Sequence, residues 1–562
     1  MRYRVEQIKL NLDEALAVNN GARAIKVEEG LGVYSGDSIL HEKISTKVGR
    51  KKLAPKEISN VEIIRRSIDA RFGDVKFVYT LDFDSEKRLN LSVVNKPKYV
   101  IPTASAARDS VAAESVPAET APGAARPVVI GFGPCGMFAA LVLARAGLKP
   151  IVFERGSDVE SRIKKVQRFW DEKILDTECN VQFGEGGAGT FSDGKLNTGI
   201  KDERIRFVLE TFVNAGASPD VLIDARPHIG TDVLRKIVKS IREEIIALGG
   251  EVHFDSKLVG IETSETGINT IIVEETLSRE SIAQTIQTKS LILAIGHSAR
   301  DTVRMLYESG IKMEQKPFSM GVRVQHSQEL IDRATYGDSY GHPALPHAYY
   351  KLSYRAEDGR GVYSFCMCPG GEVVNASSEH GRVATNGMSN SGRDSGFANS
   401  GILVDVRVSD FPSDHPLSGL ELQGEYETRA FKEGGSDYTL PRTCWKEYQE
   451  AIESKTKKSD NKVINSLPDF VSADIYEAMP VFGRKLKGFD NDDTLMLAIE
   501  SRSSSPVRMT RNKETLCALH GIYPGGEGAG YAGGITSAAV DGMRCAEAVL
   551  KRLSGQTEAS VL

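Results

Sequence analysis

The chain of 562 residues lacks the features that mark several protein classes. It contains no run of about 18 uninterrupted apolar residues, so no segment is expected to span a bilayer. Its N-terminus, MRYRVEQIKLNLDEALAV, is charged from the second residue and has no apolar centre of the kind found in signal peptides. We therefore predict a cytoplasmic protein with no membrane partner.

Cysteine is scarce, with seven residues scattered along the chain and no CxxC motif, which excludes a disulfide scaffold. The closest pair is Cys366 and Cys368 in FCMCPGG. On an extended strand, one intervening residue places both thiols on the same face, which allows a metal or redox role. The alternative is two small apolar side chains in a core strand. No companion pair supplies further ligands, so we predict no metal site.

Charge is unevenly distributed along the chain. The formal net charge is −5, but residues 1–100 carry +5 and residues 101–562 carry −10. The basic residues that cluster in the first part are Lys47, Arg50, Lys51, Lys52, Lys56, Arg65, Arg66 and Arg71. Such a patch can follow the phosphates of a nucleic acid, although a run of this kind is more often a solvated face.

Residues 1–100 have the pattern of a small α+β module. Segments 2–12, 61–70 and 75–84 are predicted strands, and residues 41–50 are a predicted helix. The next segment, residues 101–126, consists mainly of Ala, Ser, Pro, Glu and Thr. It has too little apolar surface to offset its ordering entropy, so we predict a disordered linker.

The strongest local motif follows this linker. The apolar stretch Val128-Val129-Ile130 precedes Gly131-Phe-Gly133-Pro-Cys-Gly136, and a predicted helix follows. In this pattern the first glycine permits a tight turn, the second lets the backbone approach a pyrophosphate, and the third lets the helix pack on the sheet. The phosphates would then lie at the helix N-terminus.

An acidic residue supports a dinucleotide at this motif. Glu154 ends the second predicted strand, 18 residues after Gly136. A carboxylate at that position can accept hydrogen bonds from both hydroxyls of an adenosine ribose and would repel a 2′-phosphate. The surrounding pattern of strand, turn, helix and strand makes a coincidental glycine-rich turn the weaker interpretation.

These residues resemble the FAD-binding sites of the glutathione-reductase-like flavoprotein superfamily. The resemblance rests on Pro134 and Cys135 within the fingerprint and on Glu154-Arg155-Gly156 after the second strand. It extends to the predicted helix 231–250, to three predicted strands at 251–262, 268–277 and 286–296, and to the C-terminal glycine-rich loop. The contacts with FAD that the resemblance implies come from Arg155, Arg162, Leu258, Ala294, Gly296 and Glu527. Relatives usually carry Asp where this chain has Glu527.

Two glycine-rich loops are further candidates for contact with the cofactor. The loop GEGGAGTFSDGKLNT contributes Gly189, Thr190, Ser192, Lys195 and Leu196, and the ammonium of Lys195 would stabilise negative charge on a reduced flavin. A surface loop is the alternative. The flavin ring also needs backbone N–H groups at its pyrimidine edge, which Gly533, Gly534 and Ile535 at the start of the last helix would provide.

A narrower resemblance is carried by residues 183–198, 364–374, 500–508 and 523–542. Together these segments are similar to a bacterial family of uncharacterised FAD-dependent dehydrogenases, over roughly residues 1–555. The resemblance implies an α/β fold with a Rossmann-type FAD-binding domain built on a parallel sheet, an inserted mixed β-rich domain and the small N-terminal α+β module. We predict that the FAD-binding domain covers 127–316 and 481–562 and that a substrate or cap domain covers 317–480.

Several polar residues are candidates for the substrate side, but the sequence assigns no catalytic residue. His297 follows the predicted strand near the cofactor and is either a proton donor or a loop histidine. Arg502, Ser503, Ser504 and Arg508 form either an anion site or a surface turn. The Gly/Ser/Asn-rich stretch 386–400 is a further candidate for the substrate side, through Asn386, Asn390 and Arg393, and only its position in the chain supports this.

We therefore predict an FAD-dependent oxidoreductase that acts on a small molecule by transfer of a hydride or two electrons. The Cys-x4-Cys spacing of disulfide reductases is absent, and so is a second GxGxxG unit, so NAD(P)H would dock only transiently. An alternative is a flavoprotein that binds RNA or another anionic partner through the basic N-terminal module.

Overall fold

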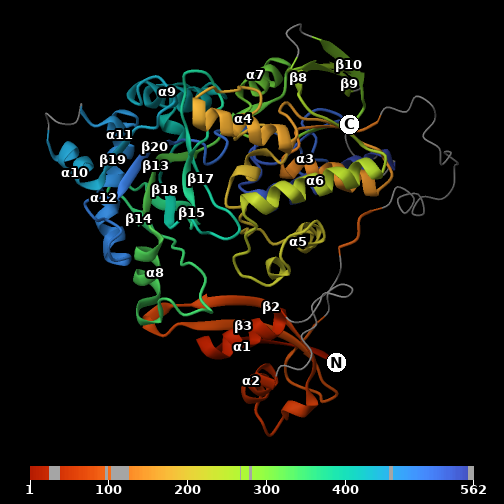
Figure 1. Ribbon diagram of the computed structural model, residues 1–562. Coiled ribbons are helices and arrows are strands. Elements are labelled where there is room, and N and C mark those ends of the chain that lie inside the picture. The colour runs from red at the N-terminus through yellow and green to blue at the C-terminus, as the bar shows by residue number, and fades with distance from the viewer. Residues whose placement is uncertain are drawn as a thin grey trace.

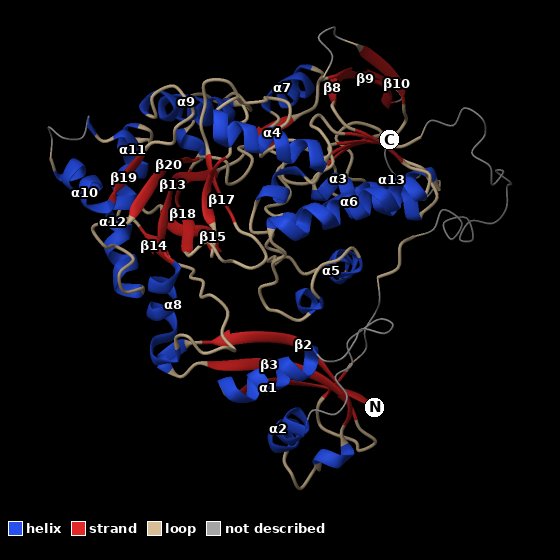
Figure 2. Ribbon diagram, in the orientation of Figure 1, coloured by secondary structure: helices blue, strands red, loops and turns tan. Residues whose placement is uncertain are grey.

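The computed structural model describes residues 1–23, 38–94, 99–102, 126–265, 267–277, 282–454 and 460–554. Figure 1 shows an N-terminal module in red and orange below a larger body. In Figure 2, helices α3, α6 and α13 lie on the right of this body, and strands β13, β15 and β18 of a second sheet lie on its left. No helix among these residues is sufficiently long and apolar to cross a bilayer. The predicted linker falls largely on residues 103–125, which lie outside the described residues.

The N-terminal module has the predicted α+β class, and its described residues form an antiparallel sheet of four strands with two helices, where the sequence predicted three strands and one helix. Its strands follow the order β2-β3-β1-β4. Alternating residues of β3, such as Phe77, Tyr79 and Leu81, enter one core. The elements are β1 (Arg2–Leu10), α1 (Leu12–Arg23), α2 (Ser38–Val48), β2 (Ser59–Asp69), β3 (Lys76–Asp84) and β4 (Ser92–Val93).

The module is docked onto the body by β2. Arg66 exchanges two backbone hydrogen bonds with the segment 223–225, at 2.7 and 2.8 Å, and its guanidinium contacts Asp224 at 2.7 Å. Leu345, which lies between the first two strands of the second sheet along the chain, packs against the core of the module. Just before the predicted linker, the hydroxyl of Tyr99 donates to Glu547 of the last helix at 2.6 Å. The module is therefore joined to the body at β2, and the chain contacts the body again just after the module.

The central sheet of the body is parallel and has the order β22-β11-β5-β6-β7. Its middle residues, including Val129, Val152 and Ile292, face one core with the helices α3, α6 and α13. The alternate residues, including Val128 and Leu291, face a second core. The strands are β5 (Val128–Ile130), β6 (Ile151–Phe153), β7 (Glu251–His253), β11 (Leu291–Leu293) and β22 (Ile522–Pro524).

The helices that cover this sheet form where apolar residues recur at the spacing of one helix face. The helix predicted from 231 buries Leu234, Ile237, Val238, Ile241 and Ile245 on one face. The glycine motif opens α3, which is buried on nearly all sides because α13 and α6 both pack against it. The helices of this part are α3 (Pro134–Arg145), α4 (Val159–Glu172), α5 (Arg204–Asn214), α6 (Thr231–Ala247), α7 (Arg300–Glu308) and α13 (Ile535–Leu553).

Two of the three strands predicted after α6 are each divided in the structure. Segment 251–262 forms β7 of the parallel sheet and then β8 (Ser256–Ser264), and segment 286–296 contributes the end of β10 (Ala283–Gln287) and all of β11. The strands β10, β9 (Gly267–Glu275) and β8 form a separate antiparallel sheet. The first of these segments is divided at Asp255, whose φ of 51° turns the chain from β7 in the parallel sheet to β8 in the antiparallel sheet.

The second large sheet has six strands in the order β14-β15-β18-β13-β20-β19. Its strand β20 lies beyond residue 480, where we placed the end of the second domain, and pairs with β13 and β19. The strands are β13 (Phe318–Ser327), β14 (Ser353–Arg355), β15 (Gly361–Pro369), β18 (Phe397–Val406), β19 (Arg442–Cys444) and β20 (Leu495–Glu500).

Helices and two small strand pairs complete this part. The chain leaves the parallel sheet through β12 (Met313–Gln315) and returns through β21 (Val507–Met509), and these two strands pair with each other. A hairpin of β16 (Glu372–Asn375) and β17 (Thr385–Met388) lies beside the large sheet. The helices are α8 (Gln328–Tyr336), α9 (Ser418–Glu433), α10 (Trp445–Glu453), α11 (Lys462–Asn465) and α12 (Asp469–Lys485).

Candidate functional site

A cavity of about 390 Å³ lies where the ends of the parallel strands meet the second sheet. This volume is within the range of about 300–1,000 Å³ that is usual for small-molecule and cofactor sites. Most of the residues predicted from the sequence line it. They are Gly131, Gly133, Pro134, Cys135, Glu154, Arg155, Gly189, Ser192, Lys195, Leu258, Ala294, Gly296, Glu527, Gly533, Gly534 and Ile535.

Two helices begin at this cavity without a side-chain cap. The N-cap of α3 is Gly133 and the N-cap of α13 is Gly534, and neither helix has a side chain that accepts its first N–H groups. Free N–H groups at a helix N-terminus, together with the helix dipole, favour an anion or a polar ligand edge. The cavity therefore has two sites for negative charge on a single ligand.

The glycines of the first turn have distinct structural roles. Gly131 has φ +94°, and a Cβ there would lie 2.3 Å from the carbonyl oxygen of Ala294. A Cβ on Gly136 would lie 1.9 Å from the carbonyl oxygen of Gly131. Both residues must therefore be glycine for α3 to reach the sheet. Gly136 does not line the cavity, in agreement with the packing role that its motif position predicts.

Glu154 lies at one end of the cavity, where three backbone N–H groups hold its carboxylate. Its Oε2 accepts from Phe132 at 2.8 Å, and its Oε1 accepts from Gly156 at 3.0 Å and Gly184 at 2.9 Å. A carboxylate has about four acceptor positions. Roughly one therefore remains for a ligand hydroxyl.

Arg155 lies beside Glu154 and is largely neutralised by the protein. Its guanidinium contacts Glu178 at 2.6 Å and Asp301 at 2.9 Å, and it stacks 4.1 Å from the ring centroid of Phe183. The side chain thus presents a flat, paired surface to the cavity and little free charge. Leu258, at the start of β8, is buried and lines the same end of the cavity.

Three residues predicted to contact the cofactor lie behind the cavity wall. Arg162 is fully buried and donates to the carbonyl oxygens of five residues: Asn180, Val181, Gly184, Glu185 and Gly187. Thr190 donates to the carbonyl oxygen of Glu185 at 3.0 Å, and the side chain of Leu196 lies in the helical core. These residues shape the glycine-rich loop from behind, because its turns leave carbonyl groups that need donors.

Lys195 crosses from this loop toward the second sheet. Its Nζ lies 3.2 Å from Oδ2 of Asp193, 3.9 Å from Sγ of Cys366 and 3.7 Å from Sγ of Cys368. Burial alone would lower the pKa of Lys195, but Cys366, Cys368 and Asp193 together raise it. The side chain is therefore a fixed cation in the cavity wall.

His297 and Glu527 both line the cavity, and Nε2 of His297 lies 3.7 Å from Oε2 of Glu527. Burial lowers the pKa of His297 to about 4, and Arg502 and Arg300 act in the same direction. Burial raises the pKa of Glu527 to about 7. Near neutral pH the imidazole is uncharged and the carboxyl group is in part protonated, so this pair can accept or supply a proton beside a ligand.

The Glu527→Gln substitution is expected to flatten the pH dependence of stability of the protein without FAD. The pKa of Glu527 is raised in the folded state, so its stabilising contribution is fully present below about pH 4.5 and is lost as pH rises through about 7. The wild type should therefore lose stability relative to the variant between these values. Denaturant midpoints at about pH 5 and about pH 8 measure this. Glu514→Gln, at an exposed position, is the control, and parallel pH profiles for wild type and Glu527→Gln would contradict the expectation.

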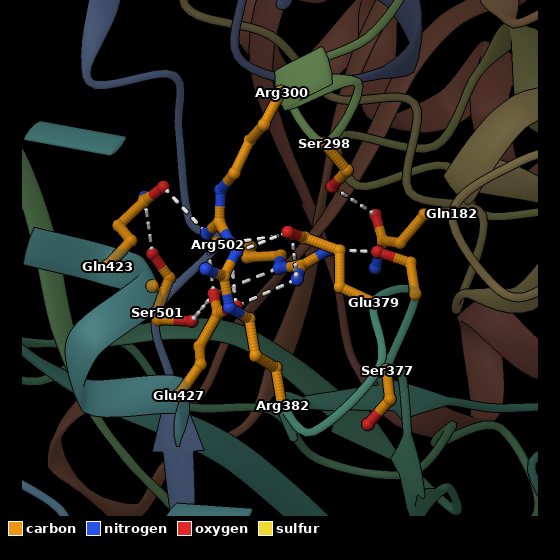
Figure 3. A network of polar contacts seen from close by, with 12 residues as sticks. Gln182, Ser298, Arg300, Ser377, Glu379, Arg382, Gln423, Glu427, Ser501 and Arg502 are labelled. Carbon is orange, nitrogen blue, oxygen red and sulfur yellow. Dashed lines mark hydrogen bonds and ion pairs between the residues drawn. The ribbon is translucent and has the colours of Figure 1, made fainter. Parts of the chain in front are cut away.

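A buried ion network supports the cavity from the side of the second sheet (Figure 3). Glu427 of α9 accepts from Arg300 at 2.8 Å and from Arg502 at 2.8 Å, and Glu379 pairs with both arginines at 2.7 and 3.3 Å. The hydroxyl of Ser501 also donates to Glu427 at 2.7 Å. The network joins α7, α9 and the segment after β20.

This network changes the interpretation of the predicted anion site. Arg502 and Ser503 line the cavity, but the guanidinium of Arg502 is bound to Glu427 and Glu379. Arg508 is partly exposed and pairs with Glu314. The predicted cluster is therefore divided, because β21 carries Arg508 away to the outer surface.

The remaining candidates are distributed between the cavity and its support. Asn386 lines the cavity. Arg393 instead contacts Asp193 at 3.2 Å, and Asn390 lies at the N-terminus of α6 beside Gly230. In the predicted basic patch, Arg50 pairs with Glu42, Arg71 with Asp69, and Arg66 with Asp224.

Sequence reasoning missed several residues that the second sheet and the adjacent β16–β17 hairpin bring to the cavity. Phe365, Thr385 and Glu500 line it from β15, β17 and β20. Arg323, from β13, holds Glu500 through two contacts of 2.6 Å. The alternation of side chains along β15 and β20 could have predicted which residues share a face of each strand, but it does not indicate which face meets the cavity.

Comparison with known proteins identifies relatives over nearly the whole chain. A protein from Clostridium beijerinckii, named "Uncharacterized protein", is 42% identical over 569 residues, which is 98% of this chain and 99% of the relative. The chain belongs to the family of this protein. Within it, residues 317–503 match the family model "FAD-dependent protein, C-terminal domain-like", and residues 4–84 match a domain of unknown function.

Solved structures that resemble this chain do so at low sequence identity and low structural similarity. A geranylgeranyl bacteriochlorophyll reductase-like protein from Thermoplasma acidophilum is 13% identical, with a TM-score of 0.35, over 77% of this chain and 79% of that one. Glycerol-3-phosphate dehydrogenase from Bacillus halodurans, complexed with FAD, is 12% identical, with a TM-score of 0.31, over 77% and 65%. The family member described here has an α/β fold with a five-stranded parallel sheet, a second, antiparallel sheet and an N-terminal α+β module.

Proposed function

We propose that this protein is an FAD-dependent oxidoreductase that oxidises or reduces a small molecule by two-electron transfer. The observation that carries the proposal is the meeting of two uncapped helix N-termini and Glu154 in one cavity. A dinucleotide with a ribose at one end, two phosphates and a polar ring edge at the other matches this order of groups. The match of residues 317–503 to an FAD-dependent family model supports the choice of FAD.

The residues that would hold FAD follow from their place in the cavity. Glu154 would accept a ribose hydroxyl, the N-terminus of α3 at Gly133 would receive the pyrophosphate, and the N-terminus of α13 at Gly534 would meet the pyrimidine edge of the ring. When bound, FAD supplies two-electron redox chemistry. Lys195 would place a positive charge beside it.

The protein's own groups would orient the substrate and move protons. His297 and Glu527 both line the cavity wall, 3.7 Å apart, so either could exchange a proton with a ligand placed beside them. Thr385 and Asn386, the first two residues of β17, supply further polar groups. The Glu427 network, which fixes Arg502, holds this wall in place. The proposal includes a small-molecule substrate, and NAD(P)H that binds only transiently. Binding of RNA or another anionic partner by the N-terminal module stays a prediction from charge alone.

Two measurements, made one after the other, test the proposed function. The purified full chain should retain FAD, or take it up when FAD is added, with the visible absorbance of a bound flavin. An anaerobic survey of metabolites and reduced nicotinamides should then identify a compound that bleaches this absorbance. A folded protein that refuses FAD would overturn the proposal, and a bound flavin that no compound reduces or reoxidises would favour a structural role for it.

A further inference from the structure

The two cysteines singled out in the sequence meet at the cavity wall. Cys366 lines the cavity and is half-buried, whereas Cys368 is fully buried next to it. In a regular strand, residues two apart are separated by about 6.6 Å along the chain, which is near the upper limit for a disulfide. The strand β15 is not regular at this point.

A bulge brings the two thiols together. The pairing of β15 with β18 shifts register between Phe365 and Cys368, and Cys366 has φ +43°, which is rare for a residue with a side chain. The Sγ of Cys368 lies 3.2 Å from the carbonyl oxygen of Cys366, and Arg323 donates to the same oxygen at 3.4 Å. The bulge is therefore held from two sides, one of them a buried arginine.

Both sulfur atoms also face one cation. Lys195 lies within 3.9 Å of each Sγ, and Asp193 fixes it on the other side. A hydrogen bond from Cys368 lowers the pKa of Cys366, and Lys195 and Arg323 act in the same direction against the effect of burial. A thiolate beside a cation, with a second thiol in contact, is the arrangement of reactive cysteine pairs.

A metal site and a structural role explain this arrangement less well. Across the described residues, no group of three or more His, Cys, Asp and Glu side chains is arranged to hold a metal ion, and the ammonium of Lys195 already occupies the space between the thiols and Asp193. Two purely apolar core cysteines would have no reason to lie against the ammonium of the half-buried Lys195. The buried Cys545, by comparison, has its pKa raised by burial to a value well above the ordinary one.

We propose that Cys366 and Cys368 are a redox-active dithiol that exchanges two electrons with the bound flavin. The proposal rests on the proposed function, because FAD is the electron partner. On oxidation, both S–H bonds break and one S–S bond forms, and the two electrons and two protons pass to oxidised FAD. The half-buried Cys366 is the sulfur that a thiol or disulfide entering the cavity would reach, so the substrate class is a thiol or disulfide compound.

An anaerobic reductive titration of the full-length holoprotein tests this. After oxidation by a glutathione redox buffer and its removal, the wild type should take up two electrons more per bound flavin than Cys366→Ser. Cys368→Ala, which adds no polar atom to a buried position, is the second variant. Cys444→Ser is the matched control, since this half-buried cysteine is an N-cap, where serine is favoured.

A second readout follows the sulfur atoms directly. Trypsin should release peptide 361–382, which contains both cysteines and no internal Lys or Arg. In the oxidised wild type this peptide should be lighter by two hydrogens and resist alkylation. In the reduced protein, Lys195→Met should slow alkylation of Cys366, because loss of the neighbouring cation raises the pKa of this thiol and leaves less thiolate at a fixed pH.

The outcomes separate the two proposals. A colourless protein that refuses FAD overturns the proposed function and this inference with it. A yellow protein in which wild type, Cys366→Ser and Cys444→Ser take up equal numbers of electrons overturns this inference alone. So does a peptide 361–382 that stays fully alkylated after oxidation.

Discussion

A Gly133→Ala variant is expected to fold normally and to bind FAD about 10- to 100-fold more weakly than the wild type. Gly133 has φ −76°, which alanine adopts freely, and a Cβ there would meet only Gly187, at ordinary distances of 3.6 Å and more. The apoprotein should therefore tolerate it. The added methyl group would lie where the pyrophosphate approaches α3, and overpacking of this kind costs about 1–3 kcal/mol, where each 1.4 kcal/mol is tenfold in affinity.

Titration of the apoprotein with FAD, followed by flavin fluorescence, measures this effect. Gly199→Ala is the control, because a Cβ at that position has no neighbour within 4 Å and its φ is not positive. Gly131→Ala provides the contrast, since its clash with Ala294 should impair folding itself. Equal affinity of the Gly133→Ala and Gly199→Ala variants would show that the phosphates do not lie at α3.

The Glu427→Ala substitution is expected to lower the free energy of unfolding by about 3–5 kcal/mol, because it removes the only fully buried carboxylate of the network and leaves Arg300 and Arg502 with the partly exposed Glu379. Glu427 is completely buried, and Arg300 and Arg502 are 2% and 5% exposed in their side chains. The same substitution should lower the temperature at which bound flavin is released, because Arg502 and Ser298 line the cavity.

Glu425→Ala, on the same helix, is the matched control. Its carboxylate forms an exposed pair with Arg429, and exposed pairs contribute about 0–1 kcal/mol and are screened by salt. Burial would raise the pKa of Glu427, but Arg300 and Arg502 outweigh it and hold the pKa well below the ordinary 4.5. The stabilisation is therefore present above about pH 4.5 and is lost as pH falls further, and denaturant midpoints of both variants check it. Similar losses in the two variants would contradict the role of the buried network.

Local motifs in the sequence predicted the end of the cavity that is formed by the glycine turn and Glu154. The turn at Gly131, the start of α3 and the position of Glu154 all depend on residues within about 25 positions of one another. Backbone constraints of this kind act over short distances, since glycine permits a turn and a helix begins where its apolar period begins. The same reasoning predicted α6 and the strands of the N-terminal module.

The support behind the cavity wall could not be derived in this way. Arg162 and Lys195 look alike in the sequence, as cations near glycine-rich segments. In the structure Arg162 serves carbonyl groups behind the loop, whereas Lys195 extends to Cys366, 171 residues away. Which side of a loop a long side chain takes depends on the donors and acceptors packed around it, and these come from distant elements.

Residues close together in the chain were enough to predict the parallel α/β unit, its glycine turn and its acidic residue, because each is required by the local geometry of strand, turn and helix. Other contacts depend on how distant segments pack. The bulge of β15 that joins Cys366 to Cys368 and the Glu427 network lie on the side of the six-stranded sheet, whereas His297 and Glu527 follow the neighbouring strands β11 and β22, 230 positions apart. Burial explains these contacts, because a buried charge or polar group is costly without a partner, and spacing along the chain does not reveal which partner it has.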